Sequence, residues 1–373
     1  MSNNLALNDE DFGAILPFIK DDLITDINYN GRALWIDHRK KGRYEVKNSG
    51  ITDNWIAQFV QKLSNKMNVQ CNKSQPYLEA ETDQLRISII HEAVTNTGYS
   101  ISIRKTPPVR RITYESIIKD KYCDKGIEAF LGNAVKAHFN IVVCGIPGTG
   151  KTELVKYLTK YIPRYEKVIT IEDNYEIRYS SINPTKDCVE IKVNDLMSYD
   201  QAIKLSMRQL PKWILIAETR GQEVVELLKS LSTGTNCLTT LHTDSVRKVP
   251  ERIRNMNIDM VNINDVYMFI DIAVQVKSVV KEGEGIKRYI SELALIYHDI
   301  DTGENSVIMI YENGKYLTDA SKLPEDVMIK FREAGFSDPF VKVEDNNDDT
   351  ATNDNETNST TNITENQTSN LIQ

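Results

Sequence analysis

The feature that most constrains the fold is the stretch NIVVCGIPGTGKTELVKYL at residues 140–158. An apolar run suited to a strand leads into the pattern Gly-x4-Gly-Lys-Thr, and a helical pattern follows it. Strand, glycine-rich turn and helix together make a phosphate-binding loop (P-loop), whose backbone amides and helix N-terminus hold an anion. A strand followed by a helix is also the repeating unit of a parallel sheet, so we expect an α/β domain with a mainly parallel sheet.

Each position of this loop has a chemical task. The glycines at 148 and 150 let the backbone approach a phosphate group. Lys151 is expected to reach the β- and γ-phosphates of ATP, and the Thr152 hydroxyl to hold Mg²⁺. A simple glycine-rich turn is the alternative, and the flanking strand and helix patterns disfavour it. The predicted nucleotide-binding residues are Gly145, Ile146, Pro147, Gly148, Thr149, Gly150, Lys151 and Thr152.

Three later apolar runs end abruptly in polar residues. KVITIED ends at Glu172-Asp173, WILIAE at Glu218, and CLTTLH at His242. In an open α/β sheet the ligand lies beyond the carboxyl ends of the strands. Taken singly, each end is compatible with ordinary strand termination. Together with the P-loop, they predict one site at which four strand ends converge.

The expected roles follow from charge. Because Mg²⁺ bound to phosphates prefers carboxylates and waters, Glu218 and Thr152 are the predicted metal ligands. Hydrolysis also needs a group that orients or deprotonates the attacking water, and Glu172 is the first candidate. Asp173 and Glu176 stay open as alternatives, since one of the three carboxylates can simply cap the next turn.

Arginines are candidates for offsetting the charge that develops on the transferred phosphoryl group. Arg104, Arg110 and Arg111 lie at the end of the first domain or in the linker, and Arg208 and Arg220 flank the strand that ends at Glu218. For each of them a solvated surface charge is the competing interpretation.

The region before the P-loop has a different pattern. Two strands around Asn30-Gly31, a helix within 55–67 and two strands within 85–104 predict a small α/β domain. The prolines of KTPPVRR (105–111) indicate a linker after it. The predicted organisation is an N-terminal domain at 1–106, a linker at 107–114, an ATPase domain at 115–343 and a tail at 344–373.

The tail carries most of the net charge. Of the formal net charge of −8, the seven acidic residues from Glu344 onward contribute −7, which leaves −1 for the rest. An acidic segment rich in Asn and Thr is expected to be disordered. Since the remainder is nearly neutral, direct nucleic-acid binding is not expected.

Cysteine usage and hydropathy bear on the compartment. The five cysteines are scattered, odd in number and never spaced as C-x-x-C, which disfavours a disulfide framework or a zinc site and fits a reducing cytosol. The polar N-terminus is unlike a signal peptide, and no run approaches ~18 apolar residues. We therefore expect a cytoplasmic protein that associates only peripherally with the cytoplasmic face of a membrane.

At this point the motifs match a known family. The P-loop, TIED-x-x-E (170–176), ILIAETRG-x-E (214–223) and TG-x4-TTLH (233–242) follow one another in the order of the Walker A, Asp box, Walker B and His box of secretion and pilus-assembly ATPases. The chain resembles that type II/IV secretion system ATPase superfamily over roughly residues 12–320. Within the superfamily it resembles the type IV secretion and CpaF (Tad pilus) branch.

The resemblance implies a PAS-like N-terminal domain and a RecA-like ATPase domain in a homohexameric ring, with ATP and Mg²⁺ between the two domains. It makes Glu172 the catalytic glutamate, Glu218 the Walker B carboxylate and His242 a sensor near the γ-phosphate. Arg104 resembles the N-domain arginine that reaches the phosphates. Inner-membrane platform or channel proteins of a secretion or pilus machine are the implied partners.

Three positions depart from the family pattern. Lys212 stands where the family usually has Asp, Ala217 where it has Gly, and Thr235 where a second histidine is common. None of these removes a group named above. Two other functions remain open: a RecA-like DNA-dependent ATPase or helicase, and a nucleotide-binding scaffold with little turnover.

Overall fold

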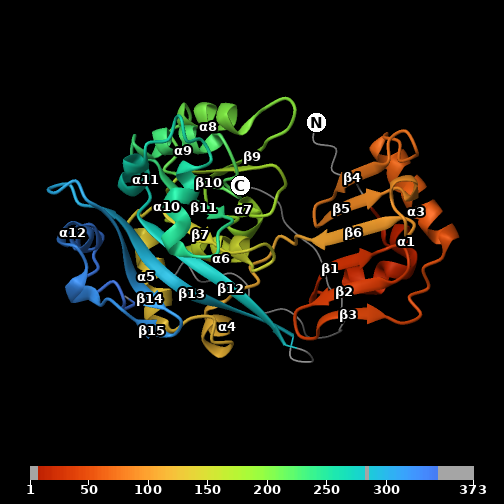
Figure 1. Cartoon of the computed structure of the whole chain (residues 1–373), viewed down its shortest axis with the longest axis horizontal. Helices are drawn as coiled ribbons and strands as arrows, with labels where there is room; N and C mark the ends of the chain where they lie inside the picture. The colour runs from red at the N-terminus through yellow and green to blue at the C-terminus, as the bar shows by residue number, and fades with distance from the viewer. Residues whose placement is uncertain (1–6, 282–284, 343–373) are drawn as a thin grey trace, which may run out of the picture.

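The computed structural model describes residues 7–281 and 285–342 and contains two β-sheets. Six antiparallel strands form the N-terminal sheet, in the order β3-β2-β1-β6-β5-β4. Nine strands form the second sheet, in the order β15-β14-β13-β12-β7-β11-β10-β8-β9. The two sheets lie side by side as separate bodies, joined by the segment that follows β6 (Figure 1). The fold class is therefore the predicted one, a small α/β N-terminal domain and a RecA-like domain.

In the N-terminal domain, helices cover one face of the sheet, and their apolar residues share one core with its strands. The predicted hairpin around Asn30-Gly31 and the helix that contains Trp55 are both present. The two edge strands, β3 and β4, were not predicted, because their sequences are mainly polar. The elements are α1 Asp9–Phe12, α2 Leu16–Lys20, β1 Ile24–Tyr29, β2 Leu34–His38, β3 Gly42–Val46, α3 Asp53–Met67, β4 Tyr77–Glu81, β5 Leu85–Ile90 and β6 Ser100–Lys105.

In the second sheet, β12, β7, β11, β10, β8 and β9 run parallel, and β13, β14 and β15 add antiparallel pairs at one edge. The central strands β7, β8, β10 and β11 are buried along their whole length, which explains why they are mainly apolar runs, whereas the edge strand β9 is only partly buried. The strands are β7 Ile141–Cys144, β8 Val168–Glu172, β9 Cys188–Lys192, β10 Trp213–Ile216, β11 Asn236–Leu241, β12 Ile272–Lys281, β13 Gly285–His298, β14 Asn305–Glu312 and β15 Lys315–Tyr316.

Helices pack on both faces of this sheet. One core includes residues of α5, α6 and α12, and the other includes residues of α8 to α11. The helices are α4 Tyr114–Lys119, α5 Lys125–Lys136, α6 Lys151–Leu158, α7 Tyr179–Ile182, α8 Tyr199–Met207, α9 Glu223–Leu231, α10 Val249–Arg254, α11 Ile263–Phe269 and α12 Glu325–Glu333. Short 3₁₀ turns lie at Gly13–Ile15, Glu92–Val94, Thr159–Tyr161, Val246–Lys248 and Ala320–Lys322.

The long strands β12 and β13 extend from the RecA-like sheet toward β3 of the N-terminal domain (Figure 1). The Ile286 amide donates to the Arg39 carbonyl over 3.2 Å, so this pair of strands contacts the turn after β2. Within the described part of the chain, no helix is both long enough and apolar enough to cross a bilayer. The predicted disorder of the acidic tail falls outside the described residues.

Candidate nucleotide site

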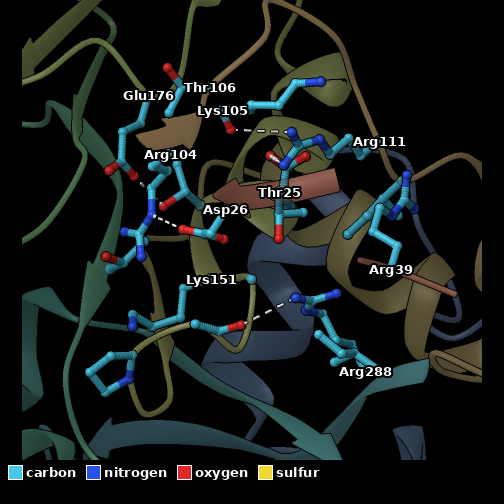
Figure 2. A pocket seen from close by; sticks show the side chains of 18 of the residues that line it. Thr25, Asp26, Arg39, Arg104, Lys105, Thr106, Arg111, Lys151, Glu176 and Arg288 are labelled. Carbon is cyan, nitrogen blue, oxygen red and sulfur yellow. Dashed lines mark hydrogen bonds and ion pairs between the residues drawn. The ribbon is translucent and has the colours of Figure 1, made fainter. Parts of the chain in front are cut away.

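A cavity of about 1100 Å³ lies between the two domains. Its wall combines N-terminal strands, the linker, the P-loop, the carboxyl ends of β8, β10 and β11, and the β12–β13 pair. Figure 2 shows Thr25 and Asp26 of the N-terminal domain across the cavity from Lys151 of the P-loop. The convergence predicted from the strand ends is therefore present, and the N-terminal domain covers it.

The P-loop has the backbone that phosphate binding requires. Gly145 has a φ of 154°, and a Cβ atom at this position would lie 2.5 Å from the Val276 carbonyl oxygen of β12. Gly150 has a φ of 93° and caps the N-terminus of α6, which begins at Lys151. Both conformations are strained for residues with a side chain, so the glycines shape the loop.

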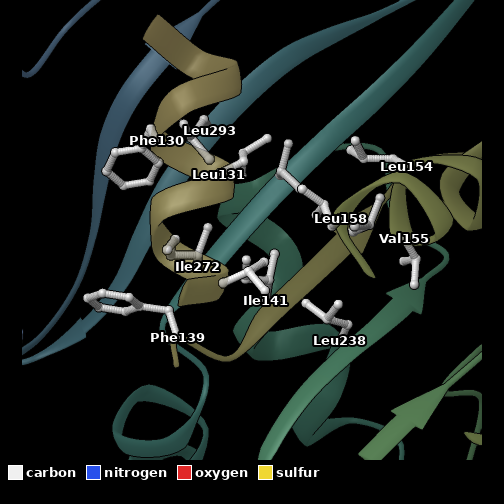
Figure 3. Packing of buried hydrophobic residues seen from close by; sticks show 14 of the residues in the cluster. Phe130, Leu131, Phe139, Ile141, Leu154, Val155, Leu158, Leu238, Ile272 and Leu293 are labelled. Atoms are coloured by element: carbon white, nitrogen blue, oxygen red, sulfur yellow. The ribbon is translucent and has the colours of Figure 1, made fainter. Parts of the chain in front are cut away.

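The loop rests on an apolar support that belongs entirely to the RecA-like domain. On α6, Leu154 and Leu158 are 1% and 0% exposed, and they belong to the core that includes Ile141 and Leu238 of the flanking strands (Figure 3). Burying such side chains stabilises the fold by roughly 1.5–3 kcal/mol each. Strand and helix therefore hold the P-loop as one rigid unit.

Lys151, His242 and Glu218 form a chain of contacts at the base of the cavity. The Lys151 Nζ lies 3.2 Å from the His242 Nδ1, and the His242 Nε2 lies 2.7 Å from a Glu218 oxygen. Burial lowers the pKa of His242, and the Lys151 ammonium lowers it further. A neutral imidazole protonated on Nε2 satisfies both contacts, since it accepts from Lys151 and donates to Glu218. His242 thus links the P-loop lysine to the carboxylate after β10.

Arg220 extends this arrangement toward the next strand. Its guanidinium donates to Glu218 over 2.7 Å and to Asp173 over 3.0 Å. The hydrogen bond to Glu218 raises the pKa of Arg220. One cation therefore bridges the carboxylates that follow β10 and β8.

Glu172, the first candidate for activating water, is fully buried and does not line the cavity. One of its oxygens accepts hydrogen bonds from the backbone amides of Glu176 and Ile177, at 2.8 and 3.0 Å. Its other oxygen is buried and has no hydrogen-bond partner. Burial raises the pKa of Glu172 to about 8. In this arrangement its carboxyl group supports the loop after β8 and does not reach a water in the cavity.

Two carboxylates of that loop do face the cavity. Asp173 and Glu176 both line it, and a Glu176 oxygen accepts a hydrogen bond from the Thr152 hydroxyl over 3.0 Å. Of the three carboxylates considered from the sequence, Glu176 therefore lies against the P-loop. We call residues 173–178 the acidic loop.

The candidate arginines separate into different roles. Arg104 lines the cavity and donates to Asp26 over 2.9 Å, and Arg111 lines it and donates to the Lys105 carbonyl over 3.2 Å. Arg110 does not line the cavity, because its guanidinium bonds to Asn183 and to the Lys156 carbonyl. Arg208 caps the C-terminus of α8 and lies outside the cavity wall.

Sequence reasoning missed Arg39 and Arg288, which also line the cavity. Arg288 of β13 donates to the Gly148 carbonyl over 3.4 Å (Figure 2). Burial lowers the pKa of Arg288, and the charge of Arg39 lowers it further. Arg288 lies in the segment KRYISEL (287–293), and nothing in the sequence places this segment beside the P-loop.

The donor set suits a magnesium ion. Thr152, Glu176 and Glu218 line the same cavity. The Thr152 hydroxyl donates its hydrogen bond to Glu176, so the lone pairs of its oxygen are free to bind a cation. Mg²⁺ at nucleotide sites typically takes one or two carboxylates together with phosphate oxygens and waters. The described residues contain no group of three or more His, Cys, Asp or Glu side chains arranged around a metal position.

The RecA-like fold, the P-loop and the carboxylates around it define this protein as a P-loop ATPase. Residues 61–280, more than half of the chain, match the family model "Type II/IV secretion system protein". The chain belongs to this family, and it is a secretion- or pilus-related ATPase.

Two relatives illustrate the match. An uncharacterised protein of Bacillus anthracis is 27% identical over 347 residues, which cover 89% of this chain and 78% of that protein. The type IV secretion system protein PtlH of Bordetella pertussis is 27% identical over 179 residues, 44% of this chain and 52% of PtlH. The chain covers only 31% and 56% of two uncharacterised proteins of Methanocaldococcus jannaschii.

Solved structures agree on the fold. The ATPase DotB of Yersinia pseudotuberculosis matches with a TM-score of 0.60 at 14% identity, over 81% of this chain and 82% of DotB. The pilus retraction motor PilT matches with a TM-score of 0.56 at 17% identity, over 78% of this chain and 84% of PilT. At these identities the likeness supports the fold and carries no residue roles.

Proposed function

We propose that the chain is a Mg²⁺-dependent ATPase that works as a homohexameric ring. It couples ATP hydrolysis to the assembly of, or transport through, a type IV secretion or Tad-like pilus system. The observation that carries the proposal is the cavity in which the P-loop and three further strand ends meet beneath the N-terminal domain. We keep the predicted domain boundaries, with a linker at 107–114, as part of this proposal.

In the proposed reaction the P-loop amides and Lys151 bind the phosphates of ATP. Thr152 and Glu218 would hold Mg²⁺, whose positive charge would offset the negative charge of the phosphates. Glu176 takes over the role first expected of Glu172 and orients the attacking water, because its carboxylate lies in the cavity beside Thr152. Arg104, from the other domain, supplies positive charge near the phosphates.

His242 has a distinct part in this proposal. Lys151 must turn toward the phosphates when ATP binds, and its present contact with the His242 Nδ1 then loosens. Because the same ring also contacts Glu218, the imidazole couples the position of Lys151 to that of the Walker B carboxylate. This is the geometry expected of a sensor of the γ-phosphate.

The proposed partners are copies of the same chain and the inner-membrane platform or channel proteins of the secretion or pilus machine. The proposed location is the cytoplasm, at the cytoplasmic face of that membrane. The family and the PtlH relative support this placement.

Phosphate release by the purified protein tests the proposal. We expect Mg²⁺-dependent ATP turnover that Lys151→Ala lowers by about 100- to 1000-fold, because the variant loses the positive charge that Lys151 would place beside the transferred phosphate. Lys229→Ala, on the exposed face of α9, is the matched control and is expected to keep wild-type turnover. Turnover near the wild-type level in Lys151→Ala would refute the assignment of the P-loop.

Two further measurements separate this function from the alternatives. A hexameric mass in solution with ATP present is expected, and a monomer under all nucleotide conditions contradicts the ring. Strong stimulation by DNA together with strand unwinding would favour a helicase. Wild-type cellular function in Glu218→Gln would favour a scaffold with little turnover.

A further inference from the structure

The acidic loop is held in place from both domains. Within the RecA-like domain, Glu172 accepts hydrogen bonds from the amides of Glu176 and Ile177, as described above. From the N-terminal domain, a carboxylate oxygen of Glu81 accepts a hydrogen bond from the amide of Tyr175 over 3.2 Å. The amides of residues 175–177 are therefore held by two carboxyl groups, that of Glu81 from the N-terminal domain and that of Glu172 from the RecA-like domain.

Glu81 is well anchored for this contact. It is the last residue of β4, and its other carboxylate oxygen pairs with Lys192 at the end of β9. The side chains of Glu81 and Lys192 are only 15% and 30% exposed, so the pair is partly shielded from water. A partly buried ion pair is screened less by salt than a pair on the surface.

Further contacts close the same junction. The Lys192 ammonium and the Arg178 guanidinium each lie 5.6 Å from the centre of the Tyr175 ring. The Arg178 guanidinium also donates to the carbonyl of Thr82, next to Glu81, over 3.4 Å. The end of β4 thus contacts the acidic loop at two positions, the amide of Tyr175 and the side chain of Arg178.

The position of this junction matters for the cavity. Glu176 follows Tyr175 directly, and its carboxylate accepts a hydrogen bond from the Thr152 hydroxyl. A rotation of the peptide between Asn174 and Tyr175 would turn the next residue, and a shift of about 1 Å at a reacting group can lower a rate about 100-fold. The contact between Glu81 and the Tyr175 amide can therefore act on the direction of the Glu176 carboxylate through the backbone.

We propose that Glu81 is a positioning residue through which the N-terminal domain holds the acidic loop in the arrangement that hydrolyses ATP. The inference rests on the proposed function, because it names the regulation of that same site. When the N-terminal domain is docked, Glu81 fixes the Tyr175 amide and Glu176 faces the P-loop. When the domain moves away, the loop loses this acceptor and hydrolysis slows, while the P-loop keeps its own support and still binds nucleotide.

The kinetic test compares Glu81→Ala with Glu81→Gln. Glu81→Ala is expected to lower kcat about tenfold, the effect of one hydrogen bond to a charged group, while KM and the Kd for ADP stay within about twofold. Glu81→Gln keeps an oxygen for the Tyr175 amide and is expected to retain kcat within about threefold. Glu79→Ala, two residues earlier on β4 and exposed, is the matched control and is expected to behave as wild type. A raised KM with unchanged kcat in Glu81→Ala overturns the proposal.

Amide hydrogen exchange tests the same claim without turnover. In Glu81→Ala the segment that contains Tyr175 and Glu176 is expected to exchange at least about tenfold faster, while the P-loop helix keeps its protection. Unchanged exchange in this segment overturns the proposal. If wild-type protein shows no ATP turnover at all, the proposed function fails, and the exchange result still decides whether Glu81 holds the loop.

A second variant covers the case in which Glu81→Ala does not fold. Lys192→Met leaves β4 untouched and removes the ion pair that anchors Glu81. It is expected to lower kcat and to speed amide exchange in the acidic loop, as Glu81→Ala does, but by only about two- to fivefold, because Glu81 itself is retained and one partly buried ion pair is lost. If neither quantity changes in a folded Lys192→Met protein, the inference is wrong.

Discussion

The two walls of the nucleotide cavity are supported in different ways. The P-loop lies between β7 and α6, whose apolar side chains are buried in the cores on the two faces of the RecA-like sheet. The acidic loop opposite has one apolar anchor in one of these cores, Ile177, and its residues 173–176 are held by directed polar contacts. These come from Glu172, from the Tyr199 hydroxyl and from Glu81 of the other domain. Apolar support is non-directional and independent of pH, whereas polar support depends on protonation and on the position of the partner.

This difference separates two properties of the enzyme. Under the proposed function, affinity for nucleotide follows from the P-loop wall, which a single domain builds. The proposed rate of hydrolysis also depends on the acidic loop, which both domains hold. The proposed ring could then change its hydrolysis rate by moving a domain and still keep its nucleotide bound.

Weakening the apolar wall should produce the largest change in stability. Leu154→Ala removes a side chain that is 1% exposed and leaves a cavity under the P-loop. We expect the free energy of unfolding to fall by about 2–5 kcal/mol, measured by chemical denaturation. Leu196→Ala, at a side chain that is 91% exposed, is the control and should change it by less than about 0.5 kcal/mol. Equal effects of the two variants would show that the P-loop wall does not depend on its core.

Removing the link between Lys151 and Glu218 should affect catalysis more than folding. His242→Ala leaves Lys151 and Glu218 without their shared partner, and the side chain of His242 is 34% exposed, so little core is lost. We expect kcat to fall about 10- to 100-fold, with the Kd for nucleotide within about twofold of wild type. His298→Ala, on β13 away from the cavity, serves as the control. Loss of folded structure in His242→Ala would assign the imidazole a purely structural role at the strand end.

The polar wall should carry a pH dependence that the apolar wall lacks. The pKa of Glu172 is raised from 4.5 to about 8 in the folded protein. Between these two pH values the folded state keeps the proton on Glu172, whereas the unfolded state has released it. Stability from this group is therefore complete below about pH 4.5 and declines as the pH rises toward about 8, by up to about 1.4 kcal/mol per pH unit. Denaturation of wild type and Glu172→Gln across this range measures the effect. The glutamine variant should have the shallower slope, and parallel slopes would contradict the buried, protonated carboxyl.

Much of this site was predictable, because parallel topology places strand ends together. Gly148, Gly150 and Lys151 of the P-loop lie around one cavity with a polar residue from the end of each of three apolar runs: Asp173, Glu218 and His242. The sequence supports this conclusion because in a sheet covered on both faces only the strand ends are free to carry function.

The direction of the carboxylates after β8 was not predictable. All five residues of β8 are buried, so alternation does not distinguish a cavity-facing residue from a core-facing one, and Glu172 turned out to face inward. The contact between Glu81 and Tyr175 could not be predicted from the sequence for a different reason. Glu81 and Tyr175 are 94 positions apart, and the edge strand β4 that carries Glu81 has only two buried apolar residues, Leu78 and Ala80.

The most direct test of this account compares two glutamine substitutions in single-turnover hydrolysis of prebound Mg²⁺-ATP. Glu176→Gln should bind ATP normally and hydrolyse it about 100-fold more slowly, because the amide no longer orients the water as a carboxylate does. Glu172→Gln should hydrolyse within about threefold of wild type, because its side-chain oxygen can accept the same two amide hydrogen bonds and its NH₂ group replaces an oxygen that has no partner. The reverse order, with Glu172→Gln inactive and Glu176→Gln active, would contradict the assignment of Glu176 to the reaction and of Glu172 to its support.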